Sequence, residues 1–323
     1  MKSNSILIAV ICGLIAAVLF LSPMTLGGMG LVMSSFTALP LFIAVLGFGT
    51  TVGIISCVVA AGMVAVFMGV LGGLSVLLAT LAPAIWIGHS VGLSRNDGGE
   101  NGEIGSEEWF PLSQVLFRLA IISAAIVITI GYLTAYSEQW AIDEAIAMMS
   151  QVAQMQNQAG DSSIVITPAD VEARAKDVAS LIPIMMPVSI LLLMVLNLRL
   201  AERFARRRNW MLRPRDDLPS SVNMPPMAAG IFLVAAVIAA ITTNQIGMVA
   251  QVVAGAFGGA FALVGLATIH FITRGLAARP FLLPVVYVVL LFSRFIAPVF
   301  AVLGVAECLF RVRARFAAPP KST

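Results

Sequence analysis

Residues 49–73 read GTTVGIISCVVAAGMVAVFMGVLGG, a stretch without a charged side chain in which a small residue recurs at every fourth position. In a lipid bilayer, apolar side chains gain little by leaving their surroundings, so helices associate through close backbone packing, which small residues permit. Because a row spaced by four drifts about 40° per step around a helix of 3.6 residues per turn, it must face more than one neighbour. We therefore predict tightly packed membrane helices here, with helix-packing positions at Gly49, Gly53, Ala61, Ala65, Gly69 and Gly73.

The composition of the whole chain also indicates a membrane protein. Of its 323 residues, 59% are hydrophobic and 11% are charged, whereas a soluble domain carries roughly 25% charged residues. Apolar runs of about 17 to 25 residues, long enough to cross a bilayer as a helix, recur along the chain. The runs are continuous rather than alternating, which excludes a transmembrane β-barrel. The predicted fold is an all-α, polytopic transmembrane helix bundle.

The apolar runs predict about eight to ten membrane segments. The stretch 280–310 would span about 46 Å as one straight helix, which exceeds the thickness of a membrane. Since Arg294 and Pro298 interrupt it, we predict a hairpin of two short helices that returns the C-terminus to its starting side. The other predicted helices lie at 6–22, 37–52, 53–70, 72–92, 112–135, 181–200, 225–243 and 247–272.

Polar segments divide the chain into regions. Residues 1–93 form an N-terminal region of four predicted membrane helices, and residues 94–111 form an acidic loop. Residues 112–323 form a C-terminal membrane region. This region includes a basic loop at 200–224 and an outer insertion at 136–180, where apolar residues recur at the helical period. We expect the insertion to be an amphipathic cover over the outer mouth of the bundle.

Basic residues gather in two places, the segment Arg199–Arg215 and the C-terminus. By the positive-inside rule, both face the cytoplasm of a bacterial inner membrane, together with the N-terminus. The arginine-rich segment is expected to contact anionic lipid headgroups. Nucleic-acid binding is disfavoured, because only Phe204 and Trp210 interleave the arginines and no recognition module surrounds them.

Polar residues inside apolar segments are costly in hydrocarbon and are usually turned toward a cavity or a partner. Several of these also have a structural explanation, since His89 and Asn197 lie near helix ends where water is within reach. Two histidines without an acidic or cysteine partner at ligand spacing predict no metal site, and we expect no cofactor. The ligand-binding candidates are Trp86, His89, Asn197, Asn244, Gln245 and His270.

The chain contains no Walker phosphate loop, zinc-protease motif or nucleophile elbow. It also has no carboxylate at the centre of a predicted membrane helix. These features exclude an ATP-driven pump in one chain and argue against an enzyme and against an autonomous ion-driven transporter.

Two further rows of small residues have alternative explanations. Ala9, Gly13 and Ala17 share one face of the first helix, which either docks on another protein or packs inside the bundle. In the C-terminal half, Ala254 and Gly258 belong to a row that predicts close helix packing.

Several stretches in order resemble the YybS-like family of bacterial membrane proteins. They include TALPLFIAVLGFGTTVGIISCVVAAG, APAIWIGHSVGLSR, EWFPLSQVLFRLA and GLATIHFITRGLAARPFLLPVVYVVLLFSRF. That family is distantly similar to the substrate-binding subunits of energy-coupling-factor vitamin transporters. The resemblance implies that Ala9, Gly13 and Ala17 dock on a coupling subunit that works with ATPases, and that segment 136–180 is a lid. The chain departs from those subunits by its additional helices and long outer insertion, and by Glu307 where family members tend to have aspartate.

Two functions follow as hypotheses. In the first, the protein binds a small molecule or lipid as the capture component of a transport system powered by partners. In the second, it is a structural or regulatory membrane protein with no transport substrate. The first requires Trp86, His89, Asn197 and Asn244 to converge on one cavity, and the second predicts that they scatter.

Overall fold

The computed structural model describes residues 3–96, 107–158, 168–211, 213–292 and 296–316. Its first helices are α1 (Ser3–Leu21), α2 (Pro23–Ser34), α3 (Leu39–Phe48), α4 (Thr50–Val76), the π-helix η1 (Leu77–Leu81) and α5 (Ala82–Val91). Two short strands follow, β1 (Ser94–Asn96) and β2 (Glu107–Trp109). The remaining helices are α6 (Leu112–Leu133), α7 (Glu138–Gln158), α8 (Pro168–Arg207), α9 (Leu218–Ser221), α10 (Pro226–Ile241), α11 (Gln245–Ile272), α12 (Arg279–Phe292), α13 (Ile296–Phe310) and α14 (Val312–Phe316).

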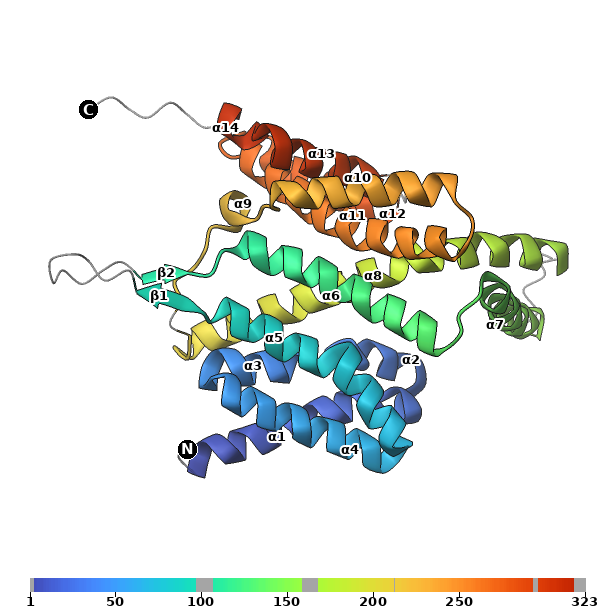
Figure 1. The fold of residues 1–323 in the computed structure, drawn as a ribbon, viewed down its shortest axis with the longest axis horizontal. Coiled ribbons are helices and arrows are strands. Elements are labelled where there is room, and N and C mark those ends of the chain that lie inside the picture. Colours follow the sequence, from blue (N-terminus) through green and yellow to red (C-terminus); the bar gives the residue numbers. More distant parts are fainter. Residues whose placement is uncertain (1–2, 97–106, 159–167, 212, 293–295, 317–323) are drawn as a thin grey trace, which may run out of the picture.

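The helices form three layers (Figure 1). Helices α1 to α5 lie on one side, α6 and α8 lie in the middle, and α10, α11 and α13 lie on the other side. One cluster of buried apolar side chains extends from Ala16 to Cys308 and draws on all three layers. The two predicted membrane regions therefore share one core.

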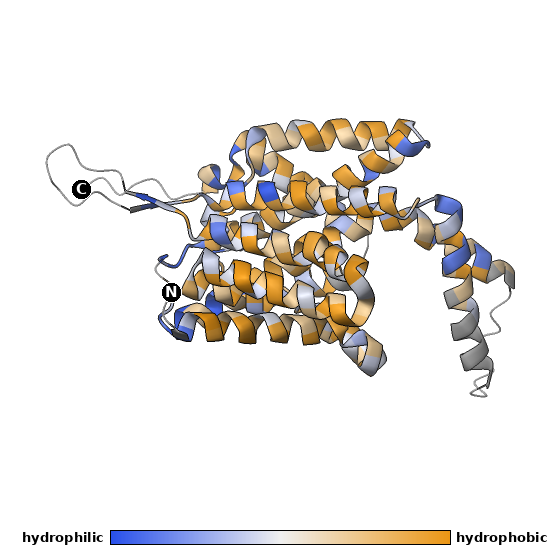
Figure 2. Cartoon of the chain, turned by 60° about the horizontal axis from the view of Figure 1, so that its bottom comes forward, coloured by the Kyte–Doolittle hydropathy of each residue, from blue (hydrophilic) through white to orange (hydrophobic). Residues whose placement is uncertain are grey.

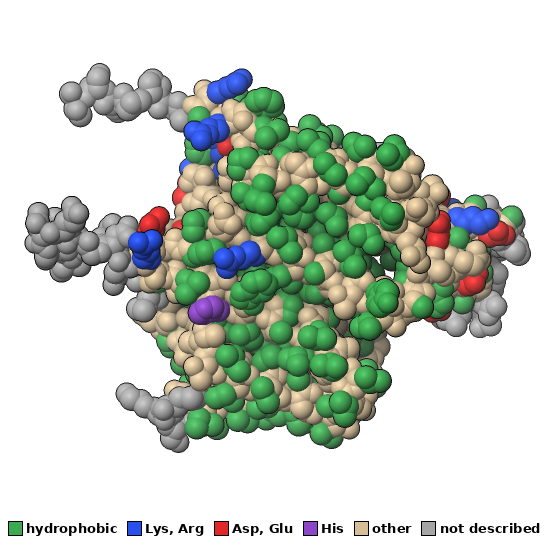
Figure 3. All heavy atoms as spheres, in the orientation of Figure 1, with side chains coloured by type: hydrophobic (Ala, Val, Ile, Leu, Met, Phe, Trp, Pro, Cys, Tyr) green, Lys and Arg blue, Asp and Glu red, His purple; other side chains and the backbone are tan. Residues whose placement is uncertain are grey.

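The all-α membrane fold is confirmed. Within the described residues, five helical stretches are long and apolar enough to cross a membrane, and the bent pair α2–α3 adds a sixth if it counts as one span. Three shorter apolar helices lie at 226–241, 279–290 and 297–310. Hydrophobic residues run along the bundle helices, and hydrophilic residues collect at the two ends of the bundle (Figure 2). Figure 3 shows the same division on one face, where apolar side chains cover the middle and charged groups lie toward the ends.

The glycine-rich stretch 49–73 is organised by two chain reversals. Gly49 (φ 93°) ends α3 and Gly69 (φ 77°) breaks α4, and nothing lies within 4 Å of where a Cβ would stand at either position. A Cβ at Gly73 would lie 2.6 Å from the Cβ of Ala65. Because residues eight apart on a straight helix are about 12 Å apart, this contact requires the chain to fold back at Gly69.

The prediction of packing is therefore wrong for two of the six small residues in this stretch. Gly49 and Gly69 are turns, since a positive φ suits glycine and disfavours residues that carry a Cβ. Gly53 packs as expected, against Val45 and Ile85, and Gly73 packs on Ala61 and Ala65. Gly49 also shifts the predicted boundary at 52–53 to the junction between Phe48 and Thr50.

Helix α11 runs through the middle of the C-terminal half and makes the closest backbone contacts. A Cβ at Gly255 would overlap the backbone of Ile184 on α8, and one at Gly265 would overlap the carbonyl group of Phe300 on α13. Gly258 has only the ring of Phe232 in contact range, at 3.2 Å, and Ala254 is half-buried. The tightest contacts therefore lie on neighbouring rows, not on the predicted row of Ala254 and Gly258.

Other boundaries differ from the sequence prediction. Helix α2 was not expected, and α8 continues past residue 200 to Arg207. The acidic loop contributes an antiparallel pair in which Ser94 faces Trp109, and residues 97–106 lie outside the described part. The stretch 280–310 divides into α12 and α13, as the predicted hairpin requires, and α13 leads into α14 at the end where β1 and β2 lie (Figure 1).

The two ends of the bundle differ in chemistry. We call the end that carries Arg199–Arg215 the arginine end; β1, β2 and α14 lie there, as does the start of α1 (Figure 1). Helix α7 and the first turns of α8 project from the opposite end. Every predicted basic cluster therefore lies at one end, as the topology prediction requires.

Candidate functional site

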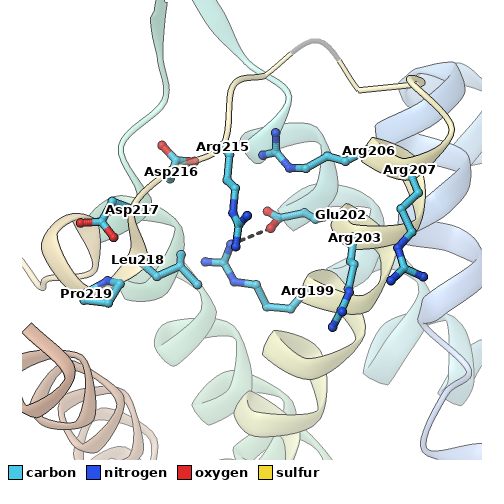
Figure 4. Close-up of a pocket in the computed structure, with 10 residues that line it drawn as sticks. All are labelled: Arg199, Glu202, Arg203, Arg206, Arg207, Arg215, Asp216, Asp217, Leu218 and Pro219. Atoms are coloured by element: carbon cyan, nitrogen blue, oxygen red, sulfur yellow. Dashed lines mark hydrogen bonds and ion pairs between the residues drawn. The ribbon is translucent and has the colours of Figure 1, made fainter. Parts of the chain in front are cut away.

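A cleft of about 810 Å³ opens at the arginine end, between the last turns of α8 and the segment 215–219 (Figure 4). Helix α8 ends here with Arg206 and Arg207 in its last turn, and basic side chains are favourable near a helix C-terminus. The lining residues are Arg199, Glu202, Arg203, Arg206, Arg207, Arg215, Asp216, Asp217, Leu218 and Pro219.

The centre of the cleft is a carboxylate beside two guanidinium groups. Arg199 Nη1 donates to Glu202 Oε2 over 2.6 Å, and the Glu202 side chain is only 8% exposed. Arg215 points toward the same carboxylate from the opposite wall (Figure 4). Such a buried charge needs a partner, because an unpaired carboxylate away from water is costly.

The wall formed by residues 213–219 is held by Arg213, whose side chain is 3% exposed. Its Nε donates to Asp216 Oδ2 over 2.8 Å, and its Nη1 donates to the carbonyl groups of Val91 and Phe110, each over 3.0 Å. The wall is thereby joined to the end of α5 and the start of α6. On the other side, Arg206 donates to the carbonyl groups at positions 213 and 214.

The C-terminal helices hold the same wall from behind. Arg274, just after α11, donates to Asp217 Oδ1 over 2.6 Å. Hydrogen bonds from Arg274 and then Ser220 lower the pKa of Asp217 below its usual value. The buried Arg313 donates to the carbonyl groups of Ser220 and Val222 and lies 3.7 Å from Glu307. The wall of the cleft is therefore held by contacts within the chain.

The cleft carries more positive than negative charge. Asp216 and Asp217 are paired with Arg213 and Arg274, neither of which lines the cleft, and Glu202 is paired with Arg199. Within the described part of the chain, no ion pair or hydrogen bond engages Arg203, Arg207 or Arg215. Guanidinium groups in this state suit a phosphate or carboxylate, which they bind through paired hydrogen bonds. The arrangement can therefore hold an anion.

The predicted ligand residues do not converge on one cavity. Trp86 is 52% exposed on α5, and His89 Nδ1 lies 2.8 Å from Thr50 Oγ1 at the turn after Gly49. His270 Nε2 lies 2.8 Å from Tyr287 Oη of α12. Trp86 and His89 stand on α5 and His270 stands on α11, and the two histidines contact different partners.

Asn197 is buried and forms a hydrogen bond with the backbone at the break between α2 and α3. Its Nδ2 donates to the Ser35 carbonyl over 2.8 Å and to the Leu193 carbonyl over 2.7 Å. Its Oδ1 is buried without a hydrogen-bond partner among the described residues. The residue thus supplies a donor to a carbonyl group that the broken helix leaves open.

Asn244 and Gln245 lie at the opposite end of the bundle. Asn244 is the N-cap of α11, since its Oδ1 accepts from the backbone nitrogens of Ile246 and Gly247. Gln245 is exposed. Asn244 also lines a small pocket of about 60 Å³ between the α10–α11 turn and the start of the insertion, where Tyr136, Glu138, Ser180, Pro183 and Gln251 are among its neighbours.

The docking interpretation of the first helix is contradicted within this chain. Ala9 and Ala17 are buried, and a Cβ at Gly13 would lie 2.6 Å from the Ser56 carbonyl oxygen and 2.7 Å from the Val59 Cβ. Helix α4 therefore covers this row. The small residues serve internal packing, which was the alternative explanation.

The sequence identified the arginine cluster but not the cleft. Glu202 was missed as its centre, although its spacing of three residues from Arg199 is a recognisable helical ion-pair pattern. Arg213 was indistinguishable from its neighbours, because its carbonyl partners lie about a hundred residues away along the chain.

A family model described as predicted membrane protein (DUF2232) matches residues 14–307. The match covers most of the chain, and the chain belongs to this family. Comparison with curated proteins and with solved structures found no match.

Proposed function

We propose that this family member is a non-enzymatic integral membrane protein whose arginine cleft binds anionic phospholipid headgroups at the cytoplasmic face of a bacterial inner membrane. The positive-inside rule supports this orientation, because the basic clusters share one end of the bundle. The cytoplasmic leaflet attracts such basic segments through its negative surface potential.

The observation that carries the proposal is the surplus of guanidinium groups in a cleft with a preformed wall. Trp210 supports a position at headgroup depth. Its ring packs on Phe48 and Phe204, with ring centroids 4.8 and 5.7 Å apart, and it stays 38% exposed. Aromatic side chains of this kind are enriched at the interface between membrane and water. The alternative is that the arginines serve only to orient the chain during its insertion into the membrane.

Two measurements test the proposal. Orientation is tested by labelling Arg315→Cys, at the arginine end, and Gln139→Cys, at the opposite end, with a membrane-impermeant maleimide in intact cells and in lysed cells. We expect Gln139→Cys to react in intact cells whose outer membrane is permeable, and Arg315→Cys to react only after lysis. The reverse pattern would overturn the proposed orientation.

Lipid binding is tested by native mass spectrometry of the full chain with phosphatidylglycerol and phosphatidylethanolamine. We expect preferential retention of phosphatidylglycerol, which falls several-fold in Arg203→Gln and Arg215→Gln. The matched control is Arg208→Gln, an exposed neighbour that lies over the Phe204 ring and does not line the cleft. If all three variants retained phosphatidylglycerol equally, the proposal would be contradicted and the arginines would have only a role in membrane topology.

A second candidate is capture of a transport substrate with help from partner subunits, as the resemblance to energy-coupling-factor proteins implies. Two observations favour it. Residues of the insertion line the small pocket that contains Asn244, and the Tyr136 hydroxyl is buried without a hydrogen-bond partner among the described residues. The pocket volume of about 60 Å³ opposes it, since pockets for small molecules have volumes of about 300 to 1,000 Å³. Mild-detergent purification from the native membrane, with proteomics and metabolite mass spectrometry, tests this function. Recovery of a coupling subunit with ATPases or of one stoichiometric metabolite would favour capture. Recovery of the chain alone would oppose it and favour the structural hypothesis.

A further inference from the structure

The arginines of the cleft form a row that is longer than a single phosphate group. Arg199, Arg203 and Arg207 are four residues apart on α8, so they share one face and follow each other in steps of about 6 Å. All three line the cleft, and Arg206 and Arg215 face it from other directions. A ligand can therefore place negatively charged groups against more than one arginine along this row.

The charge of the cleft also exceeds that of one phosphodiester. Four lining arginines have no carboxylate partner among the described residues, and only Arg206 among them is engaged, by two carbonyl oxygens. A phosphodiester headgroup brings a single negative charge. A group with two adjacent phosphates brings more charge and offers each phosphate a separate pair of guanidinium hydrogen bonds.

The cleft is ready for such a ligand before it arrives. The segment 213–222 is fixed by Arg213 to α5 and α6, by Arg274 to the end of α11, and by Arg313 to the C-terminus. Arg203 and Arg215, which stand on opposite walls, have no hydrogen-bond or ion-pair partner among the described residues that a ligand would have to displace. A preformed site lowers the ordering cost of binding.

From these contacts we infer that the arginine cleft is a diphosphate site, which binds two adjacent phosphate groups in preference to one. The inference deepens the proposed function, because it uses the same cleft and names the chemistry of its ligand. Two sources share this chemistry, a lipid with a diphosphate headgroup and a soluble diphosphate.

The test is isothermal titration of the full chain in detergent with inorganic pyrophosphate and with inorganic phosphate. We expect pyrophosphate to bind at least tenfold more tightly than phosphate. Arg203→Gln and Arg215→Gln should each weaken pyrophosphate binding by roughly tenfold, in line with the loss of a charged hydrogen bond. The control Arg208→Gln removes the same charge from the same helix end and should change the affinity by less than about twofold. Thermal unfolding of each variant checks that it is folded.

Competition then identifies the source. If vesicles containing a diphosphate lipid displace pyrophosphate and phosphatidylglycerol vesicles do not, the ligand is a lipid diphosphate. If neither kind of vesicle displaces it, the diphosphate site is one for a soluble ligand. Equal affinity for phosphate and pyrophosphate would overturn the inference, as would a loss in Arg208→Gln equal to that in Arg215→Gln. Retention of phosphatidylglycerol without any pyrophosphate binding would overturn it while leaving the proposed function intact.

Discussion

The stretch 49–73 and helix α11 are both rich in glycine and alanine, yet they use small residues in different ways. In the first, Gly49 and Gly69 turn the chain with positive φ, and no atom of another segment lies within 4 Å of where a Cβ would stand. In α11, Gly255 and Gly265 stay helical and admit the backbones of α8 and α13. Burial follows this difference: 22% of the most apolar part of residues 50–91 is buried, against 56% of the corresponding part of α11. Small residues therefore mark a peripheral fold-back in one place and a central packing helix in the other.

The largest expected effect is at the central helix. Gly265→Ala places a methyl group on the Phe300 carbonyl, and backbone cannot rotate away as a flexible side chain can. We expect α11 and α13 to separate at a cost of about 3 kcal/mol or more. Chemical unfolding in detergent, followed by circular dichroism, measures it. An unchanged midpoint would contradict the assignment of α11 as the close-packed helix.

A smaller loss is expected where α1 crosses the first stretch. Gly13→Leu must displace Val59 and the Ser56 backbone, so we expect destabilisation of about 2 kcal/mol. The same unfolding experiment measures it. If the variant were as stable as the parent but lost a co-purifying protein, the row would be a docking face after all.

A substitution at Gly69 should reduce stability only through the backbone conformation of the turn. Its φ of 77° and ψ of 170° suit only glycine, so Gly69→Ala should cost about 1 to 3 kcal/mol although the added Cβ would have no other segment within 4 Å. Thermal unfolding reports the loss. Full stability in this variant would mean that the turn can adopt another conformation.

The two regions also begin differently, since α11 starts with the Asn244 cap and α4 starts at Gly49 without a side-chain cap. Asn244→Ala leaves two backbone N–H groups without their acceptor and should cost about 1 kcal/mol. Asn244→Asp keeps the acceptor and should retain most of the stability in the same measurement. Equal losses in both variants would point to the pocket instead of the cap.

The smallest effect is expected at Gly62, which is exposed in α4 with nothing within 4 Å of a Cβ. Gly62→Ala should be neutral or stabilising by up to about 1 kcal/mol, because alanine restricts the unfolded chain. It is also the matched control for Gly265→Ala. A marked loss here would show that another surface covers this part of α4.

Much of the fold could be predicted because hydropathy is summed over local residues. The helices 112–133, 226–241 and 245–272 lie within a few residues of their predicted positions. The unexpected α2 shows where this fails. The sequence SPMTLGG contains a proline and two glycines, and the Ser22 hydroxyl lies within hydrogen-bond distance of the carbonyl groups of Leu19 and Gly30, to either of which it can donate its one proton. That contact depends on residues that meet only after the chain has turned.

The candidate site could be predicted in part for the same reason. The arginine cluster is visible in the sequence, but its use as a cleft depends on Arg213 reaching Val91 and Phe110. Asn197 shows the converse. Its cost in hydrocarbon suggests a ligand, whereas its amide nitrogen donates to a distant carbonyl group within the chain, that of Ser35.

The sequence by itself determined that the chain is an all-α membrane protein and that its positive charge lies at one end, because apolar length and charge are properties of consecutive residues. Only the tertiary structure decided which glycines turn and which pack, since that depends on φ and on the backbone of another helix. The tertiary structure also decided which arginines bind carboxylate and carbonyl groups of the protein and which are left to bind an anion. Some of this pairing is local, as between Arg199 and Glu202, but Arg274 and Asp217 are far apart in the sequence and meet only in the folded bundle.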